Sequence, residues 1–277
     1  MLHDHMVTTL SSIGSPTTKQ IEHALDTLLL HLARTNPEFA SLMRSDRLTQ
    51  PIPFFGDITS AEIVTIGVNP SADEFAPGRG WPSDPLQSCD LASRLLGYFQ
   101  SRNPHPWFTG WIRAIVAGTL PTSRHAHLDL SPRATYSFGS FTRGPSANLV
   151  LQQRFMEMVR IDLPQFLAFL DLCVSAKLVL LAGGVTKIYM DDFLARELGS
   201  DRVRFPLGRR KSGEAPVTRL EMRIGTRWIP GLFVGKGPSR EENWPFLAQR
   251  LAENREYLMR AFGSPSNAAV DPEPRCC

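Results

Sequence analysis

Cysteine is scarce in this sequence, and no apolar stretch is long. The four cysteines are Cys89, Cys173 and the terminal pair Cys276 and Cys277, which suit neither a disulfide framework nor a four-cysteine metal or iron–sulfur site. The longest apolar stretch, Leu178 to Val185, falls far short of the about 20 residues that a membrane-spanning helix needs. We therefore expect a protein of a reducing compartment that binds no metal and does not cross a membrane.

Signals for secretion and for nucleotide binding are also lacking. Residues 1–6, Met-Leu-His-Asp-His-Met, have neither the positive n-region nor the apolar h-region of a secretory signal, so we expect a cytoplasmic protein. The sequence contains no Gly-x-x-x-x-Gly-Lys-Ser/Thr and no Gly-x-Gly-x-x-Gly element. We therefore expect no cofactor.

Positive charge is modest overall but concentrated in one segment. The formal net charge is +3, whereas residues 201–227 contain eight basic residues against three acidic ones. The basic residues are Arg202, Arg204, Arg209, Arg210, Lys211, Arg219, Arg223 and Arg227. Such a segment is typical of a phosphate-binding face, although a solvated hairpin has the same composition.

Strands and helices alternate along the chain, which predicts an α/β fold with a mainly parallel sheet. β-Branched or apolar runs predict strands at residues 62–67, 127–130, 178–181 and 228–234, and residues 217–224 alternate like one arm of an antiparallel hairpin. Helical spacing predicts a first helix from Ser15-Pro16 to about Asn36-Pro37, and further helices at residues 86–100, 107–117, 147–170 and 186–198.

This order of elements predicts three layers, α/β/α, around a central four-stranded sheet. We expect an N-terminal helical extension at residues 1–50, an α/β domain at 51–262 and a disordered tail at 263–277. Ligands of parallel sheets bind at the carboxyl ends of the strands. The loops at Asn69, Asp129 and Gly237 follow three predicted strands and therefore define the expected site.

Four short motifs fall at those strand ends in a particular order. Phe54-Phe55-Gly56-Asp57 is followed by Gly67-Val68-Asn69-Pro70-Ser71, and Trp81 comes twelve residues after Asn69. Later come His127-Leu128-Asp129-Leu130-Ser131-Pro132 and Gly237-Pro238-Ser239. In order and spacing this set resembles the active-site motifs of the uracil-DNA glycosylase superfamily, whose Gly-x-Asn-Pro members share the first motif.

The resemblance implies an enzyme that flips a base out of DNA and cleaves its N-glycosidic bond. Asn69 would hold the attacking water, and Lys236 would be a cation near the leaving base. The remaining implied contacts are Val68, Ser71, Trp81 and Asp129 with the base, and Ser239, Arg240, Arg209, Arg210 and Lys211 with phosphates or as the wedge. Structural explanations compete: Trp81 as a core residue, His127 as a packed histidine, and Ser239 with Glu242 as a helix capping box.

Two departures from the family pattern concern the substrate. Ser71 replaces the tyrosine that blocks the C5 substituent, and Asp129 replaces the base-reading asparagine, so an acceptor faces the exocyclic amine of cytosine. We therefore expect a C5-modified cytosine as the substrate, as found in some bacteriophage genomes, with a role in host defence and a monomer bound to nucleoid DNA.

Three alternatives stay open at this point. The first is a uracil-repair glycosylase, and the second is a non-cleaving DNA-binding module of the same fold. The third is an unrelated enzyme that binds a small nucleotide through Gly183-Gly184.

Overall fold

The computed structural model describes most of the chain. The described residues are 16–43, 50–70, 81–82, 84–101, 106–118, 120–122, 124–135, 148–185, 188–207, 217–238 and 240–263. Among them, no helix is both long and apolar enough to cross a membrane. The expected tail from residue 264 onward lies outside this part of the chain, and the expected division into three segments stays a prediction.

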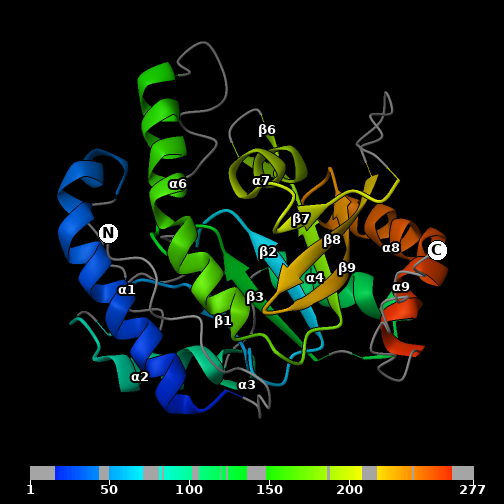
Figure 1. Ribbon diagram of the computed structural model, residues 1–277, viewed down its shortest axis with the longest axis horizontal. Coiled ribbons are helices and arrows are strands. Elements are labelled where there is room, and N and C mark those ends of the chain that lie inside the picture. The colour runs from blue at the N-terminus through cyan, green and yellow to red at the C-terminus, as the bar shows by residue number, and fades with distance from the viewer. Residues whose placement is uncertain are drawn as a thin grey trace, which may run out of the picture.

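A seven-stranded sheet forms the centre of the protein, with strand order β1-β3-β2-β4-β9-β8-β7 (Figure 1). The strands are β1 (Phe54–Phe55), β2 (Ile63–Gly67), β3 (His125–Asp129), β4 (Leu178–Ala182), β7 (Val203–Arg204), β8 (Val217–Ile224) and β9 (Arg227–Val234). The four inner strands β3, β2, β4 and β9 run parallel to one another, β1 and β8 run antiparallel to them at the two sides, and β7 pairs antiparallel with β8. The sheet is therefore wider than the four strands expected.

Helices cover both faces of the sheet, as the alternation of its buried side chains shows. Val179 and Leu181 of β4 pack in one core with helices α1, α2 and α6, whereas Leu178 and Leu180 pack in a second core with α4, α8 and α9. Strands buried on both faces in this way are typical of parallel sheets. Figure 1 shows α1 and α6 on one side of the sheet and α8 and α9 on the other. This arrangement is compatible with a three-layer architecture.

The helices largely follow the apolar periodicity of the sequence. They are α1 (Thr18–Phe39), α2 (Ser88–Leu96), α3 (Tyr98–Ser101), α4 (Pro106–Ala117), α6 (Leu149–Asp171), α7 (Met190–Leu198), α8 (Trp244–Glu253) and α9 (Arg255–Gly263), with short 3-10 turns η1 (Ala40–Leu42) and η2 (Glu241–Asn243). A capping box formed by Thr17 and Gln20 begins α1. The buried residues Ile21, Leu25 and Leu28 join α1 to the same core as the sheet.

Three predicted helix boundaries were wrong. Helix α1 continues through Pro37 to Phe39, because a proline this close to the end of a helix removes only one backbone hydrogen bond. The expected helix at 86–100 is divided at Gly97, which ends α2. The expected helix at 186–198 begins only at Met190, since the hairpin of β5 (Gly184–Val185) and β6 (Ile188–Tyr189) precedes it.

Candidate functional site

The carboxyl ends of β2 and β3 lie side by side and bring the first and second motifs together. Gly67 is paired in register with Asp129. Beyond the strands, the backbone N–H groups of Leu130 and Ser131 donate to the carbonyl oxygens of Gly67 and Val68 at 3.1 and 3.0 Å. The backbone of Val68, an expected base contact, is therefore held against the loop that follows β3.

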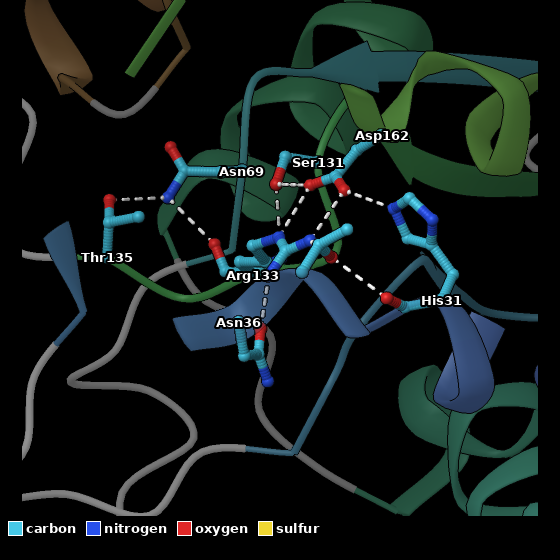
Figure 2. Close-up of polar contacts among 8 residues, drawn as sticks. His31, Asn36, Asn69, Ser131, Arg133, Thr135 and Asp162 are labelled. Atoms are coloured by element: carbon cyan, nitrogen blue, oxygen red, sulfur yellow. Dashed lines mark hydrogen bonds and ion pairs between the residues drawn. The ribbon is translucent and has the colours of Figure 1, made fainter. Parts of the chain in front are cut away.

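The Asn69 side chain ties these two loops together. Its Nδ2 donates to the Thr135 hydroxyl at 3.0 Å and to the carbonyl oxygens of Arg133 and Pro70 at 3.3 and 3.2 Å. Because two of these acceptors are carbonyl groups, only the nitrogen of the amide can face them. The Oδ1 atom points away from Thr135 and Arg133, as Figure 2 shows. Asn69 thus presents an oriented acceptor at the strand end.

Asp129 is buried beside His127 and directly over Gly67. The Nε2 atom of His127 lies 3.3 Å from Oδ1 of Asp129, and its Nδ1 lies 2.8 Å from the Thr65 hydroxyl. The Thr65 hydroxyl also donates to the Ala126 carbonyl at 3.2 Å, and His127 links Thr65 to Asp129 through its two ring nitrogens. A Cβ on Gly67 would lie 2.6 Å from Asp129 Oδ1, so only glycine leaves room for the pair.

Burial controls the protonation of Asp129. Both side chains of the His127–Asp129 pair are only 3% exposed. Desolvation raises the pKa of the Asp129 carboxyl above its ordinary value, and the attraction of His127 only partly offsets this. A ligand that donates a hydrogen bond to this carboxylate would relieve the cost of its burial.

The loop after β9 reaches the same region through an aromatic side chain. Trp107, near the start of α4, lies 6.1 Å from His127 between ring centroids, and a Cβ on Gly237 would be 3.1 Å from the Trp107 ring. The Trp244 indole donates to the Pro238 carbonyl at 2.7 Å and holds this loop against α8. The ends of β2, β3 and β9 therefore gather around the Trp107–His127 contact.

Several other expected site residues have partners of their own. Trp81 is only 5% exposed and belongs to the main core, so the structure does not present its ring as an open stacking platform. The Lys236 ammonium lies 4.5 Å from the ring centroid of Phe246 on α8. Arg240 is exposed and pairs with Glu242 at 3.3 Å, without a capping hydrogen bond from its side chain to η2. The roles of these residues in catalysis and DNA binding stay predictions.

Where the basic segment is described, its arginines make structural contacts within the protein. Arg202 forms a two-bonded pair with Asp171, and the Arg204 guanidinium lies 3.7 Å from the Trp228 ring centroid. Arg219, Arg223 and Arg227 donate to Asn254, to the Gly225 carbonyl and to the Val174 and Ala176 carbonyls. These five arginines hold β7, β8 and β9 to their neighbours, which favours the hairpin interpretation for them. Arg209, Arg210, Lys211, Ser71 and Ser239 lie outside the described residues.

A buried charged cluster, not expected from the sequence, supports the Asn69 loop from behind (Figure 2). The Arg133 guanidinium binds Asp162 of α6 through Nε and Nη2 at 2.9 and 3.0 Å. Ser131 and His31 also contact the Asp162 carboxylate at 2.6 and 2.9 Å. Burial alone would raise the pKa of Asp162, but the hydrogen bonds from His31 and Arg133 lower it below its ordinary value. The only signal in the sequence is an arginine directly after the second motif.

The geometry weakens the small-nucleotide alternative. Gly183 has a positive φ of 79°, but Gly184 enters the β5–β6 hairpin rather than a helix. Helix α7 begins only at Met190, and its first turn carries Asp191 and Asp192. Two carboxylates at a helix N-terminus disfavour a phosphate there. Among the described residues, no three His, Cys, Asp or Glu side chains gather into a group that could hold a metal ion.

Comparison with protein-family models, curated proteins and solved structures found no match to this chain. The resemblance to the glycosylase superfamily therefore rests on the order and spacing of the sequence motifs alone.

Proposed function

We propose that this protein is a DNA glycosylase that flips a C5-modified cytosine out of DNA and hydrolyses its N-glycosidic bond. One observation carries the proposal. Asn69 and Asp129 lie at the ends of adjacent parallel strands, and backbone hydrogen bonds together with those of the Asn69 amide join the loops that follow β2 and β3. The β9 loop reaches the same place through Trp107. Convergent strand-end loops are the usual ligand site of open parallel sheets.

Asn69 would contribute by positioning the water. A neutral amide cannot remove a proton at pH 7, so its Oδ1 would accept a hydrogen bond from the water and hold it below C1′ of the flipped nucleotide. The three hydrogen bonds donated by Nδ2 support this role because they fix the direction of Oδ1. The water oxygen then bonds to C1′ as the bond to the base breaks and the base takes the bonding electrons. The water proton passes through solvent to the departing base, so the sugar gains a hydroxyl and the base leaves neutral.

Asp129 would read the base. Its carboxylate accepts hydrogen bonds, and the exocyclic amine of cytosine donates one, whereas uracil offers a carbonyl oxygen at that position. His127 supports the role of Asp129 in base recognition because its Nε2 contacts Asp129 Oδ1 and so fixes the orientation of the carboxylate. Ser71, which lies outside the described residues, is smaller than the tyrosine that thymine-excluding members of the glycosylase superfamily have at this motif position, so by the resemblance the C5 side of the base would be open.

A non-cleaving DNA-binding module is the second candidate. The observation that favours it is the position of Lys236, whose ammonium lies over Phe246 and so already has an aromatic partner. If that contact persists when DNA is bound, Lys236 would not assist the departing base. Uracil repair is the competing substrate assignment within the enzyme proposal.

Cleavage and binding assays on the same duplexes test the proposal. The substrates are duplexes that contain uracil, cytosine or C5-glycosylated hydroxymethylcytosine, and the matched variants are Asn69→Ala and the exposed-surface control Asp90→Asn. We expect abasic sites from the modified duplex with wild type and with Asp90→Asn, and a loss of about 100-fold or more with Asn69→Ala while DNA binding persists. Binding without cleavage by the wild-type protein would favour the DNA-binding module, and cleavage of uracil alone would favour repair.

A further inference from the structure

The buried ion pair between Arg133 and Asp162 lies directly behind the loop that binds Asn69. The Arg133 side chain is 1% exposed and the Asp162 side chain 0%. Removing two charges from water is costly, and such pairs often contribute little to stability compared with apolar residues of similar size. A two-bonded arginine–carboxylate pair does, however, fix geometry closely. The pair is therefore important for the geometry that it fixes more than for its contribution to the free energy of unfolding.

Both ends of the pair are held by helices that pack on the sheet. The Asp162 carboxylate comes from α6 and also binds Ser131 and His31. The Nη1 atom of Arg133 donates to Asn36 of α1, and Nη2, which also binds Asp162, donates to Thr35 of α1. Figure 2 shows Asp162 and Asn36 contacting the guanidinium, and Ser131 and His31 contacting the Asp162 carboxylate. The segment from residue 131 to residue 135 is thus fixed to α1 and α6 together.

The same short segment supplies two of the three acceptors of the Asn69 amide. They are the carbonyl oxygen of Arg133 and the hydroxyl oxygen of Thr135. Any displacement of the segment moves both acceptors at once. The direction of Asn69 Oδ1 therefore depends on the ion pair, although neither charged side chain touches Asn69.

We infer that Arg133 is a positioning residue for Asn69: its pair with Asp162 anchors residues 131–135 so that they lock the Asn69 amide in one orientation. The inference rests on the proposed function only in saying that Oδ1 holds the water. The locked amide itself is a property of the fold and can be measured without any substrate. A misplacement of about 1 Å at a reacting group costs up to about 100-fold in rate.

Exchange of the Asn69 side-chain amide protons with solvent, measured by NMR on protein labelled with ¹⁵N-asparagine, reports the lock directly. Thr135→Val removes one acceptor and keeps the shape of the side chain, whereas Thr135→Ser keeps the hydroxyl. Arg133→Lys keeps the positive charge but removes the planar guanidinium group, which binds a carboxylate through two hydrogen bonds. The matched control is Arg202→Lys, because Arg202 forms a similar two-bonded pair with Asp171 of the same helix α6, away from Asn69.

We expect exchange to be about fivefold faster in Thr135→Val and Arg133→Lys, as loss of one hydrogen bond predicts, and unchanged in Thr135→Ser and Arg202→Lys. Base release should also be slower in Thr135→Val and Arg133→Lys and unchanged in Thr135→Ser and Arg202→Lys. The decrease should appear in kcat, with KM for the duplex unchanged. Exchange that stays at the wild-type rate in Arg133→Lys, while the melting temperature falls, would overturn the inference and leave Arg133 a purely structural residue.

Two further outcomes keep the test decisive. If Arg133→Lys does not fold, Asn36→Ala removes a single acceptor of the guanidinium from a partly exposed position, and unchanged Asn69 exchange in that variant overturns the inference. If exchange follows the expected order but no form of the protein releases a base, the positioning of Asn69 stands and the glycosylase proposal fails.

Discussion

Gly67 lies directly beneath the Asp129 carboxylate: a Cβ at position 67 would come within 2.6 Å of Oδ1. It would also come within 2.7 Å of His127 Nε2, so both members of the buried pair meet the same position. The two residues face each other in the parallel register of β2 and β3. The absence of a side chain at Gly67 is therefore a condition for the His127–Asp129 pair.

Gly67→Ala should displace this pair. Overpacking of this kind costs about 1–3 kcal/mol of the free energy of unfolding, which urea denaturation measures. Base release should fall by about tenfold or more because Asp129 moves. The matched control is Gly263→Ala, where an added Cβ meets no atom within 4 Å. Equal stability and activity in Gly67→Ala and wild type would show that a side chain at position 67 does not displace the His127–Asp129 pair.

Asp129→Asn should change which base the protein accepts. An amide both donates and accepts, so it can pair with O4 and N3–H of uracil, whereas the carboxylate only accepts. We expect release of uracil to rise relative to release of the modified cytosine by about tenfold or more, since a good pair of hydrogen bonds discriminates by about 1–3 kcal/mol. Competition between the two duplexes in one reaction measures the ratio. An unchanged ratio would remove Asp129 from base recognition.

Acid should destabilise the protein partly through Glu62. Partial burial opposes ionisation of this carboxyl, but hydrogen bonds from Lys177, Thr122 and Arg124 lower its pKa to about 2 from the ordinary 4.5. Because this pKa is lower in the folded protein, the ionised carboxylate stabilises the fold at pH values above 4.5. This stabilisation is lost as the pH falls from 4.5 to about 2.

At pH 7 the free energy of unfolding of Glu62→Gln should therefore be lower than that of wild type by about 1 kcal/mol. The difference is small because the partners of Glu62 are partly exposed to solvent. The difference should shrink to nothing near pH 2. Urea denaturation of both forms at several pH values measures it. A difference that stays constant with pH would assign the effect to packing instead of charge.

The two described cysteines should differ sharply in reactivity. Cys173 is fully buried, and burial raises the pKa of its thiol, whereas Cys89 is exposed at the start of α2. Because the thiolate is the nucleophile, iodoacetamide should label Cys89 in the native protein and Cys173 only in urea. Peptide mass spectrometry separates the two sites. Labelling of native Cys173 would indicate opening of the core around α6 and β4.

The inner strands of the sheet were predictable because burial on both faces leaves a continuous apolar signature. The segments that became β2 and β4 are β-branched or leucine-rich runs that end at glycine or asparagine turns, and their predictions are confirmed. The two-residue strands β1 and β7 were missed, since so short a segment has no period to detect. Their existence depends on the neighbouring strands.

The site was predictable only where it follows a strand end. Asn69 and Asp129 were predicted to share a site because the carboxyl ends of parallel strands are adjacent, and the structure does bring their loops together, while their roles stay predictions. The cluster behind Asn69 was not, because His31 and Asp162 are 131 residues apart and no local pattern connects them. Composition alone could not separate the two interpretations of the basic segment for a similar reason: it counts charges, but partners such as Asp171 for Arg202 come from distant elements.

The formation of abasic sites in duplex DNA that contains C5-glycosylated hydroxymethylcytosine tests the central proposal most directly. Alkaline strand cleavage after incubation with the wild-type protein detects these sites, with Asn69→Ala alongside. Cleavage at the modified base by wild type, with little or none by Asn69→Ala, is the predicted result. An intact modified strand, with binding to the same duplex demonstrated, would contradict the assignment of this protein as a glycosylase for that base.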